Sequence, residues 1–461
     1  MKKNQTSPKK IHYSTVRIIM LTFLAAILAG AVLLMLPIST ASREWCPFIT
    51  ALFTSTTSVC VTGLVVVDTF SYWSLFGKVI ILLLIQIGGL SVVILWAETM
   101  LILHRRISLR SHILIQNYFG LEDTQGLFRF TKKVIPGTLV VEGVGAFLYC
   151  LVLIPQNGFL KGLGQSVFTA VSAFCNAGID VFGPDSLIPY QTNLPINLIT
   201  MMLIIMGGLG FYVWFNMIDT FRKCRKRKCG LRGYFGRLNE QARLVLVTTL
   251  ILIVSGALIV FVGECRNPAT IGGMPFGDKV MASFFQSVTF RTAGFSTVPQ
   301  QDLTPFTCFA GLIYMMIGGS PTGTAGGVKT VTAAILVVSA VSYMRQEEET
   351  VVYGRKIPHR IVFKAIAIVI VFFGMAFLFT ELLLLTNDVP FLSAIYEIFS
   401  AMGTVGLSRA LTASLNAAGQ VIVIMAMYAG RIAPISMLLF FGTDNKNKKT
   451  IRHPEGRFLI G

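Results

Sequence analysis

The chain has 461 residues, of which 54% are hydrophobic and only 13% are charged, and its formal net charge is +18. A soluble domain carries about twice that share of charged residues, so this composition excludes an ordinary soluble protein. The basic surplus alone would fit a nucleic-acid-binding protein, but its distribution along the chain argues against that class.

Long apolar runs recur along the whole chain, and four of them carry no charge. A helix needs about 20 apolar residues to cross the roughly 30 Å hydrocarbon core. The runs also lack the polar face that a soluble helix shows at a spacing of 3.6 residues. We therefore predict a polytopic membrane protein with eight transmembrane helices. The runs cover residues 18–36, 79–97, 134–154, 198–218, 244–262, 306–343, 361–385 and 417–441.

Most of the lysine and arginine residues fall in five places, namely the N-terminus, 105–133, 222–243, 345–364 and 446–457. If the spans alternate in pairs, all five places lie on one side of the membrane. The positive-inside rule makes that side cytoplasmic. We thus predict a multi-pass protein of the cell membrane with a retained first span and both termini in the cytoplasm. The net charge then reflects membrane topology, and we expect no nucleic-acid partner.

Each pair of spans encloses a shorter, semi-polar stretch that ends in a glycine. The stretches are 51–63, 167–178, 284–294 and 396–406, and their final glycines lie 112–116 residues apart. A fixed period over a whole chain is typical of repeat architecture. We predict an all-α fold of four parallel helix–pore-helix/loop–helix repeats around a central pore. The expected repeats are 1–104, 105–220, 221–345 and 346–461.

The four short stretches have too few residues to span the membrane, so each is predicted to enter and leave on the same side. Exposed backbone at membrane depth is tolerated only where it is buried or lines a watery cavity. Carbonyl oxygens of such backbone replace the water shell of a cation. We therefore expect the four loops to meet as a cation-selective filter. Its residues are Val61, Thr62, Gly63, Asn176, Ala177, Gly178, Thr292, Ala293, Gly294, Thr404, Val405 and Gly406.

These loop sequences resemble those of the Trk/Ktr/HKT superfamily of cation transporters, and the resemblance covers nearly the whole chain. It rests on Cys60-Val-Thr-Gly63-Leu, Cys175-Asn-Ala-Gly178-Ile, Arg291-Thr-Ala-Gly294-Phe and Gly403-Thr-Val-Gly406-Leu-Ser, with the glycine-rich segment 317–329. The resemblance implies a potassium-translocating subunit of a sodium-dependent uptake system. K⁺ would be the permeant ion and Na⁺ a coupling or activating ion, without an organic cofactor in this chain.

The resemblance also implies partners besides the lipid bilayer. Members of the Ktr type form homodimers on a cytoplasmic ring of RCK-domain subunits that bind ATP or ADP. The C-terminal residues 456–461 are similar to the family's C-terminus, which lies at the dimer interface. The residues themselves reveal no sodium site.

Ten residues interrupt the sixth apolar run, between 306–317 and 328–343. Five glycines and a proline are incompatible with the interior of a helix. A flexible loop just inside the filter could block the pore, and the resemblance implies an intramembrane gate. A threonine occupies position 322, where family members often have a small residue. The predicted gate loop comprises Gly318, Gly319, Ser320, Pro321, Thr322, Gly323, Thr324, Ala325, Gly326 and Gly327.

Two basic residues are predicted to act on this loop. Arg431 lies within the last apolar run, where a charge is costly and usually faces a cavity or a partner. The resemblance places it beside the loop, where it would hold the loop by hydrogen bonds and raise the barrier to cations. Helix packing is the alternative role. Lys329 is expected to act similarly at the loop's far end.

Several acidic residues leave two interpretations open. Glu142 and Glu381 lie in span-like runs and could be outer-mouth charges or buried partners. Five aspartates flank the re-entrant units and could concentrate cations or be ordinary solvated charges. These are Asp68, Asp180, Asp185, Asp302 and Asp388.

Three other function classes fit the sequence less well. A transporter that alternates access around a central site would be favoured by paired carboxylates within the spans, and the glycine loops are more prominent than any such pair. An ATPase would need a second glycine where Val328 stands in the segment 323–330. We expect no enzyme, because the sequence offers no nucleophile–base or metal-ligand constellation.

Overall fold

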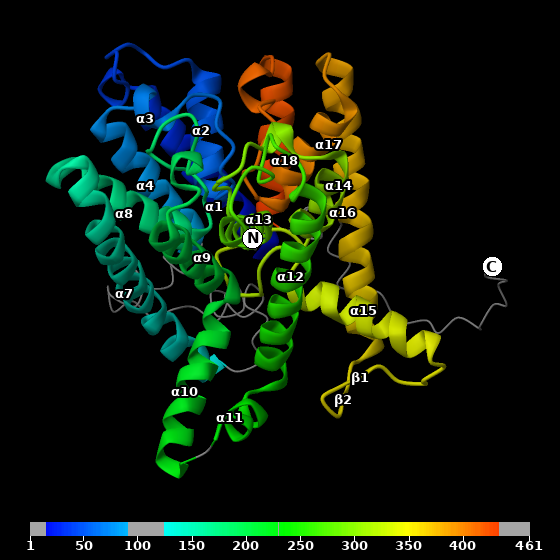
Figure 1. The fold of residues 1–461 in the computed structure, drawn as a ribbon. Helices are drawn as coiled ribbons and strands as arrows, with labels where there is room; N and C mark the ends of the chain where they lie inside the picture. The colour runs from blue at the N-terminus through cyan, green and yellow to red at the C-terminus, as the bar shows by residue number, and fades with distance from the viewer. Residues whose placement is uncertain (1–14, 91–123, 229, 433–461) are drawn as a thin grey trace, which may run out of the picture.

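A computed structural model of the protein describes residues 15–90, 124–228 and 230–432. It is a bundle of helices from which α10 and α11 extend at one end (Figure 1). Within the described ranges the strands are two short ones, β1 (Val351–Val352) and β2 (Arg355–Lys356), which pair antiparallel. The basic N-terminus, most of the stretch 105–133 and the C-terminal tail lie outside the described residues, as do the predictions made for both termini.

The described helices follow one another in four groups with the same order, a helix, a short helix with a glycine loop, and a further helix. The first group is α1 (Thr15–Met35), α2 (Phe48–Cys60), α3 (Thr69–Tyr72) and α4 (Leu75–Leu90). The second is α7 (Thr124–Asn157), α8 (Phe159–Cys175), α9 (Leu194–Leu209), α10 (Phe211–Arg227) and α11 (Leu231–Arg237). The third is α12 (Glu240–Glu264), α13 (Phe276–Phe290), α14 (Pro305–Met316) and α15 (Thr330–Met344). The fourth is α16 (His359–Thr386), α17 (Phe391–Gly403) and α18 (Ala417–Ile432). Four 3₁₀ turns cover Pro37–Ser39, Ile188–Tyr190, Gln300–Asp302 and Thr412–Ser414.

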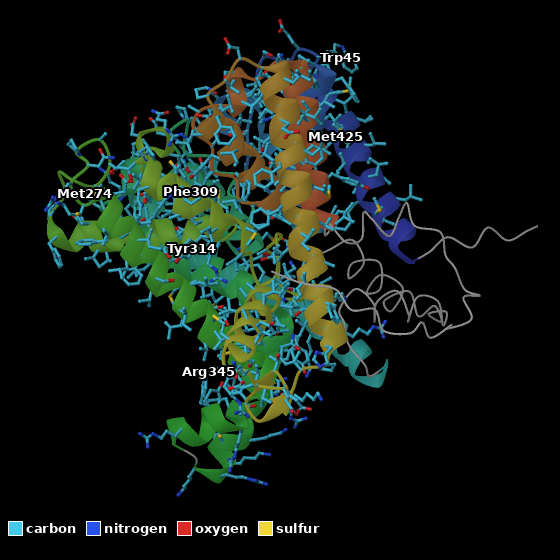
Figure 2. The ribbon with its side chains drawn as sticks, turned by 90° about the vertical axis from the view of Figure 1, so that its right-hand side faces the viewer. Trp45, Met274, Phe309, Tyr314, Arg345 and Met425 are labelled. Carbon is cyan, nitrogen blue, oxygen red and sulfur yellow. The ribbon has the colours of Figure 1, made fainter. Side chains whose placement is uncertain are left out.

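Three described helices are long and apolar enough to cross a membrane, and the bent pair of α9 and α10 adds a fourth. The three cover Lys133–Asn157, Glu240–Glu264 and His359–Thr386, and the shorter apolar helical stretches of 10–17 residues include Met20–Met35 of α1. Large apolar side chains such as Phe309 and Met425 face outward (Figure 2). Such a surface suits hydrocarbon better than water, in agreement with a polytopic membrane protein. The number of eight spans stays a prediction.

The short helices α2, α8, α13 and α17 form the centre of the bundle. Phe53 of α2, Phe174 of α8 and Tyr396 of α17 are fully buried, whereas α12 leaves Leu250 and Leu258 more than 60% exposed. The longer helices therefore surround the short ones and separate them from the outer surface. This arrangement places the glycine loops that follow the short helices inside the molecule.

The predicted span 198–218 is present as a bent pair of helices and not as one continuous helix. The chain bends by 96° between α9 and α10, at Gly210. Gly210 has a φ of +85°, which side-chain-bearing residues rarely adopt. Hydrophobicity reports the environment of a segment and not the continuity of its helix, and Gly207, Gly208 and Gly210 were the available sign of the bend. The predicted break in the run 306–343 is present, since α14 ends at Met316 and α15 begins at Thr330.

Candidate functional site

The loops after α2, α8, α13 and α17 share positive φ angles at the same two positions. Two residues before each glycine stands a residue in the left-handed region, with φ between 53° and 65°: Val61, Asn176, Thr292 and Thr404. The glycines that follow have φ between 66° and 99°. A left-handed non-glycine residue costs on the order of 1 kcal/mol or more. Because this conformation recurs in all four loops, the surrounding structure must stabilise a strained backbone there.

Hydroxyl side chains in the last turn of each short helix fix these loops. Thr57 Oγ1 accepts a hydrogen bond from the Gly63 amide at 3.0 Å, and Ser400 Oγ accepts one from the Gly406 amide at 3.1 Å. The Ser172 and Thr289 hydroxyls donate to the carbonyls of the residues that follow Gly178 and Gly294, at 2.5 and 2.6 Å. The sequence analysis missed these residues. A hydroxyl six positions before three of the glycines, and five before the fourth, was the available signal.

The four glycines lie next to one another in a closed ring. A Cβ atom added to Gly178 would lie 2.5 Å from the Cα of Gly294, and one added to Gly406 would lie 3.1 Å from that same Cα and 2.8 Å from the Cα of Gly63. One added to Gly63 would lie 3.3 Å from the Cα of Gly178. Each glycine thus contacts the glycines of the two adjacent groups, although they are more than a hundred residues apart in the chain.

Backbone carbonyls of the preceding residues also reach this ring. The carbonyl oxygens of Ala177, Ala293 and Val405 each lie within 3 Å of the Cβ position of a glycine in a neighbouring group, and the Thr62 oxygen lies similarly close to Gly406. The ring therefore brings together four carbonyl oxygens from four separate loops. Such an arrangement can coordinate a cation that has lost its water.

A cavity of about 280 Å³ opens on one side of the ring and is lined by all four glycines. Asp68 and Asp180 also line it, whereas the other three flanking aspartates are not among its lining residues. Burial, and to a smaller extent the charge of Asp68, raise the pKa of Asp180 to about 6, against hydrogen bonds from Ser186 and the Phe182 amide. The carboxylate form of Asp180, present above that pKa, gives this cavity a negative charge.

The glycine-rich segment 317–329 lies on the opposite side of the ring. The Thr324 hydroxyl donates to the Phe174 carbonyl at 3.1 Å and to Asn176 Oδ1 at 3.3 Å. Cβ atoms added to Gly318 and Gly326 would touch the side chains of Thr292 and Thr404. The segment thus meets the residues that precede the ring glycines, while the cavity meets those that follow them.

Three basic side chains hold carbonyl oxygens of this segment. Arg431 donates to the carbonyls of Thr324 and Gly88, and Lys329 Nζ donates to the Ala325 carbonyl at 2.7 Å. Arg291 donates to the Gly318 carbonyl at 3.4 Å. None of the three forms an ion pair with an acidic residue of the described ranges. The segment is therefore fixed by charge-assisted hydrogen bonds to its backbone, which are stronger than neutral ones.

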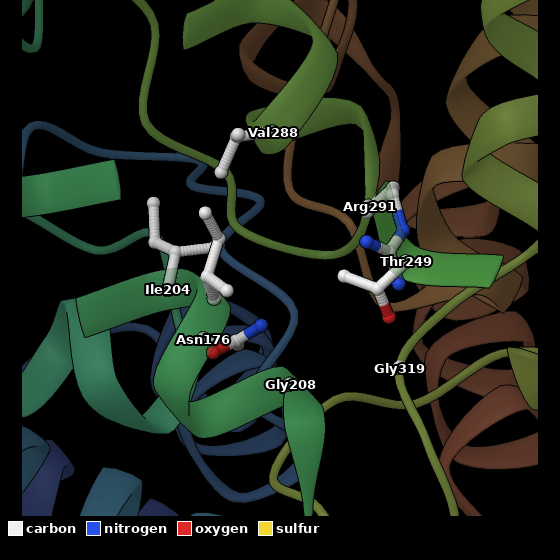
Figure 3. A pocket seen from close by; sticks show the side chains of 8 residues that line it. Asn176, Ile204, Gly208, Thr249, Val288, Arg291 and Gly319 are labelled. Carbon is white, nitrogen blue, oxygen red and sulfur yellow. The ribbon is translucent and has the colours of Figure 1, made fainter. Parts of the chain in front are cut away.

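Arg291 also lines a small cavity beneath the ring, together with Thr249, Gly208 and Gly319 (Figure 3). The cavity has about 10 Å³, roughly the room that one water molecule needs. Arg291 Nε and the Thr249 hydroxyl are buried without a hydrogen-bond partner. Sequence reasoning gave Arg291 no role, although the equivalent positions hold Cys60, Cys175 and Gly403 and the arginine is the one charge among them.

The two glutamates left undecided by the sequence have different environments. Glu142 is buried, where it accepts hydrogen bonds from Gln86 Nε2 at 3.2 Å and from Cys175 Sγ at 3.7 Å. It is thus a buried partner behind the loop of Asn176. Glu381 is exposed and lies on the surface of α16.

Two further buried glutamates were not singled out. Glu397 accepts hydrogen bonds from Ser408 and Thr412, just after the ring residue Gly406. Glu264 accepts four hydrogen bonds, two of them from Thr304 at the start of α14. Both carboxylates are fully buried and hold loop residues in place.

Comparison with known proteins places this geometry in context. A sequence profile described as TrkH, cation transport protein, matches residues 3–450. The chain is 36% identical to the Ktr system potassium uptake protein B of Bacillus subtilis over 98% of both chains. It is 32% identical to the potassium/sodium uptake protein NtpJ of Enterococcus hirae over 97% of both chains.

A solved structure shares the fold of this chain. The potassium transporter TrkH from Vibrio parahaemolyticus superposes with a TM-score of 0.75, covering 95% of this chain and 87% of that one. The two sequences are 17% identical, so this likeness concerns the fold alone. It identifies the helix arrangement as that of a polytopic membrane protein.

Proposed function

Since the chain belongs to the TrkH family of cation transport proteins, we propose that it is the potassium-translocating membrane subunit of a sodium-dependent potassium uptake system. The family consists of cation transporters, which agrees with the prediction that the chain is not an enzyme. The relatives from Bacillus subtilis and Enterococcus hirae carry potassium uptake in their names. The assignment of K⁺ as the transported ion and of Na⁺ as the coupling ion is carried over to this chain from these relatives.

The observation that carries the proposal is the ring of four glycines with its four carbonyl oxygens. Twelve residues, three from each loop, form the filter, from Val61–Gly63, Asn176–Gly178, Thr292–Gly294 and Thr404–Gly406. Positive φ at the glycines and at the residues two before them turns successive carbonyls toward one axis. A dehydrated K⁺ would exchange its water shell for these oxygens. The ionised Asp180 supports entry of cations through the cavity that adjoins the ring.

The segment 317–329 is proposed as the gate of this pathway. Support comes from its position directly against Asn176, Thr292 and Thr404, on the side of the ring away from the cavity. Three basic residues hold its backbone, and the positive charge of the two arginines, Arg291 and Arg431, opposes the passage of K⁺. Opening requires that these hydrogen bonds break and that the segment moves aside.

Sodium dependence and the partners belong to the proposal as well. The name of the Enterococcus hirae relative includes sodium. We further propose a homodimer that sits on a cytoplasmic ring of ATP- or ADP-binding RCK-type subunits. Two measurements test this assembly. The full chain should copurify with such a ring, and it should elute at the size of a dimer on size-exclusion chromatography.

Potassium uptake by cells that lack their own potassium transporters tests the function. Cells expressing the chain should accumulate K⁺ at low external concentration, faster with Na⁺ than without it. Each of the variants Gly63→Ser, Gly178→Ser, Gly294→Ser and Gly406→Ser should lose part of the preference for K⁺ over Na⁺, because a side chain at the ring forces the carbonyls apart. Retention of the full preference in all four variants would contradict the filter assignment.

A further inference from the structure

The bend at Gly210 leaves two helix ends whose backbone groups lack partners within their own helices. The last carbonyls of a helix and the first amides of the next require outside hydrogen bonds. The segment 317–329, from the next group of helices, supplies them. The amides of Ser320 and Thr324 donate to the carbonyls of Gly208 and Gly207 at the end of α9, at 2.8 and 3.2 Å.

Thr322 accepts hydrogen bonds from the first backbone amides of α10. The Phe211 amide donates to the Thr322 carbonyl at 3.3 Å, and the Tyr212 amide donates to the Thr322 hydroxyl at 3.3 Å. A threonine hydroxyl that accepts from the first turn of a helix is the usual N-terminal cap. Here the cap comes from a residue 110 positions away, because Gly210, which precedes α10, has no side chain to offer.

The contact is close and leaves no room for a side chain at the bend. A Cβ atom on Gly210 would lie 2.5 Å from the Pro321 carbonyl oxygen. Thr322 itself has a φ of +65°, a left-handed conformation that carries strain in a β-branched residue. The segment and the bend therefore fit each other as a matched pair, and neither keeps its hydrogen bonds if the other moves.

Beyond the bend, α10 runs away from the ring to the end of the bundle where it meets α11 (Figure 1). Asn239 ties it to the start of α12, since its amide donates to Asn216 Oδ1 at 3.2 Å and its side chain to the Tyr212 hydroxyl at 2.9 Å. The far end of α10 carries Arg225, Lys226 and Arg227 on an exposed surface. A displacement at Tyr212 is thus transmitted along a helix that reaches the surface.

We propose that the segment 317–329 acts as the missing turn of the broken helix α9–α10, and that its displacement and the movement of α10 are a single event. Thr322 is the positioning residue that couples the two. This inference rests on the proposed function, in which the segment is the gate. It adds that the gate of the third group is controlled through the second group.

Hydrogen–deuterium exchange and K⁺ flux, measured on the full chain in lipid vesicles, test the coupling. Arg431→Ala loosens the segment at Thr324 without touching α10, and we expect faster exchange of the Phe211 and Tyr212 amides together with a higher flux. Thr322→Ala should speed exchange of the Tyr212 amide about fivefold, the effect of losing one cap. Thr322→Ser keeps the hydroxyl and should restore it.

Thr380→Ala is the matched control, since that buried hydroxyl bonds only the Ala376 carbonyl of its own helix. If Thr322→Ala exchanges at Tyr212 no faster than this control, the cap is refuted. A higher flux in Arg431→Ala with unchanged exchange at 211–212 overturns the coupling and leaves the gate in place. Faster exchange with unchanged flux supports the coupling and refutes the gate.

Discussion

Replacement of Gly178 by alanine tests the ring most sharply, because the structure provides a control glycine that also has a positive φ. The added Cβ would lie 2.5 Å from the Gly294 Cα, about 1 Å closer than carbon atoms approach in ordinary contact. The left-handed conformation costs alanine on the order of 1 kcal/mol. Overpacking adds about 1–3 kcal/mol unless the ring widens. If the ring widens to relieve this strain, K⁺ binding weakens by a similar free energy. The K⁺/Na⁺ preference then falls by about one to two orders of magnitude.

Gly158→Ala supplies the control, because Gly158 has a φ of +81° but no atom within 4 Å of its Cβ position. The Gly158→Ala variant should experience the strain of a positive φ without overpacking, and it should retain the K⁺/Na⁺ preference. The assay is competition of Na⁺ with ⁸⁶Rb⁺ or K⁺ uptake in vesicles that contain equal amounts of each variant. A preference within twofold of the unsubstituted chain in Gly178→Ala, at equal expression with Gly158→Ala, would refute the ring as the selective element.

Three further predictions concern charged groups. Arg431→Ala should raise K⁺ flux about three- to tenfold by removing a cation beside the pathway, and unchanged or lower uptake contradicts its gating role. Uptake at low K⁺ should fall about threefold as the pH drops through 6, because Asp180, charged above its pKa of about 6, becomes neutral. Asp180→Asn should be slow at every pH, and a persisting pH response in that variant would remove Asp180 as its cause. Glu264→Ala removes four buried hydrogen bonds, leaves the Thr304 amide without its acceptor, and should lower the melting temperature by about 5 °C, with Glu264→Gln less affected. Equal melting of both variants and the unsubstituted chain would contradict that role.

The packing around Arg431 illustrates what sequence reasoning reaches. A charge within an apolar run needs a partner, and the family resemblance directed it to the glycine-rich loop; the structure places its guanidinium on the Thr324 carbonyl. Arg291 escaped notice because it stands at the end of a short semi-polar helix, where a charge is not unusual in sequence. Its burial, with 8% exposure, arises only when the other groups of helices surround it.

The features that the sequence alone determined depend on residues that are close together in the chain. Apolar runs set the membrane environment, and four glycines at a nearly constant period set four equivalent turns, because both depend on local composition and backbone freedom. The packing of the segment 317–329 against the bend at Gly210, the cap from Thr322 and the pairing of Glu264 with Thr304 were decided by tertiary structure. Each joins groups far apart in sequence, and a backbone amide or carbonyl that finds its partner there leaves no mark in the hydrophobic pattern.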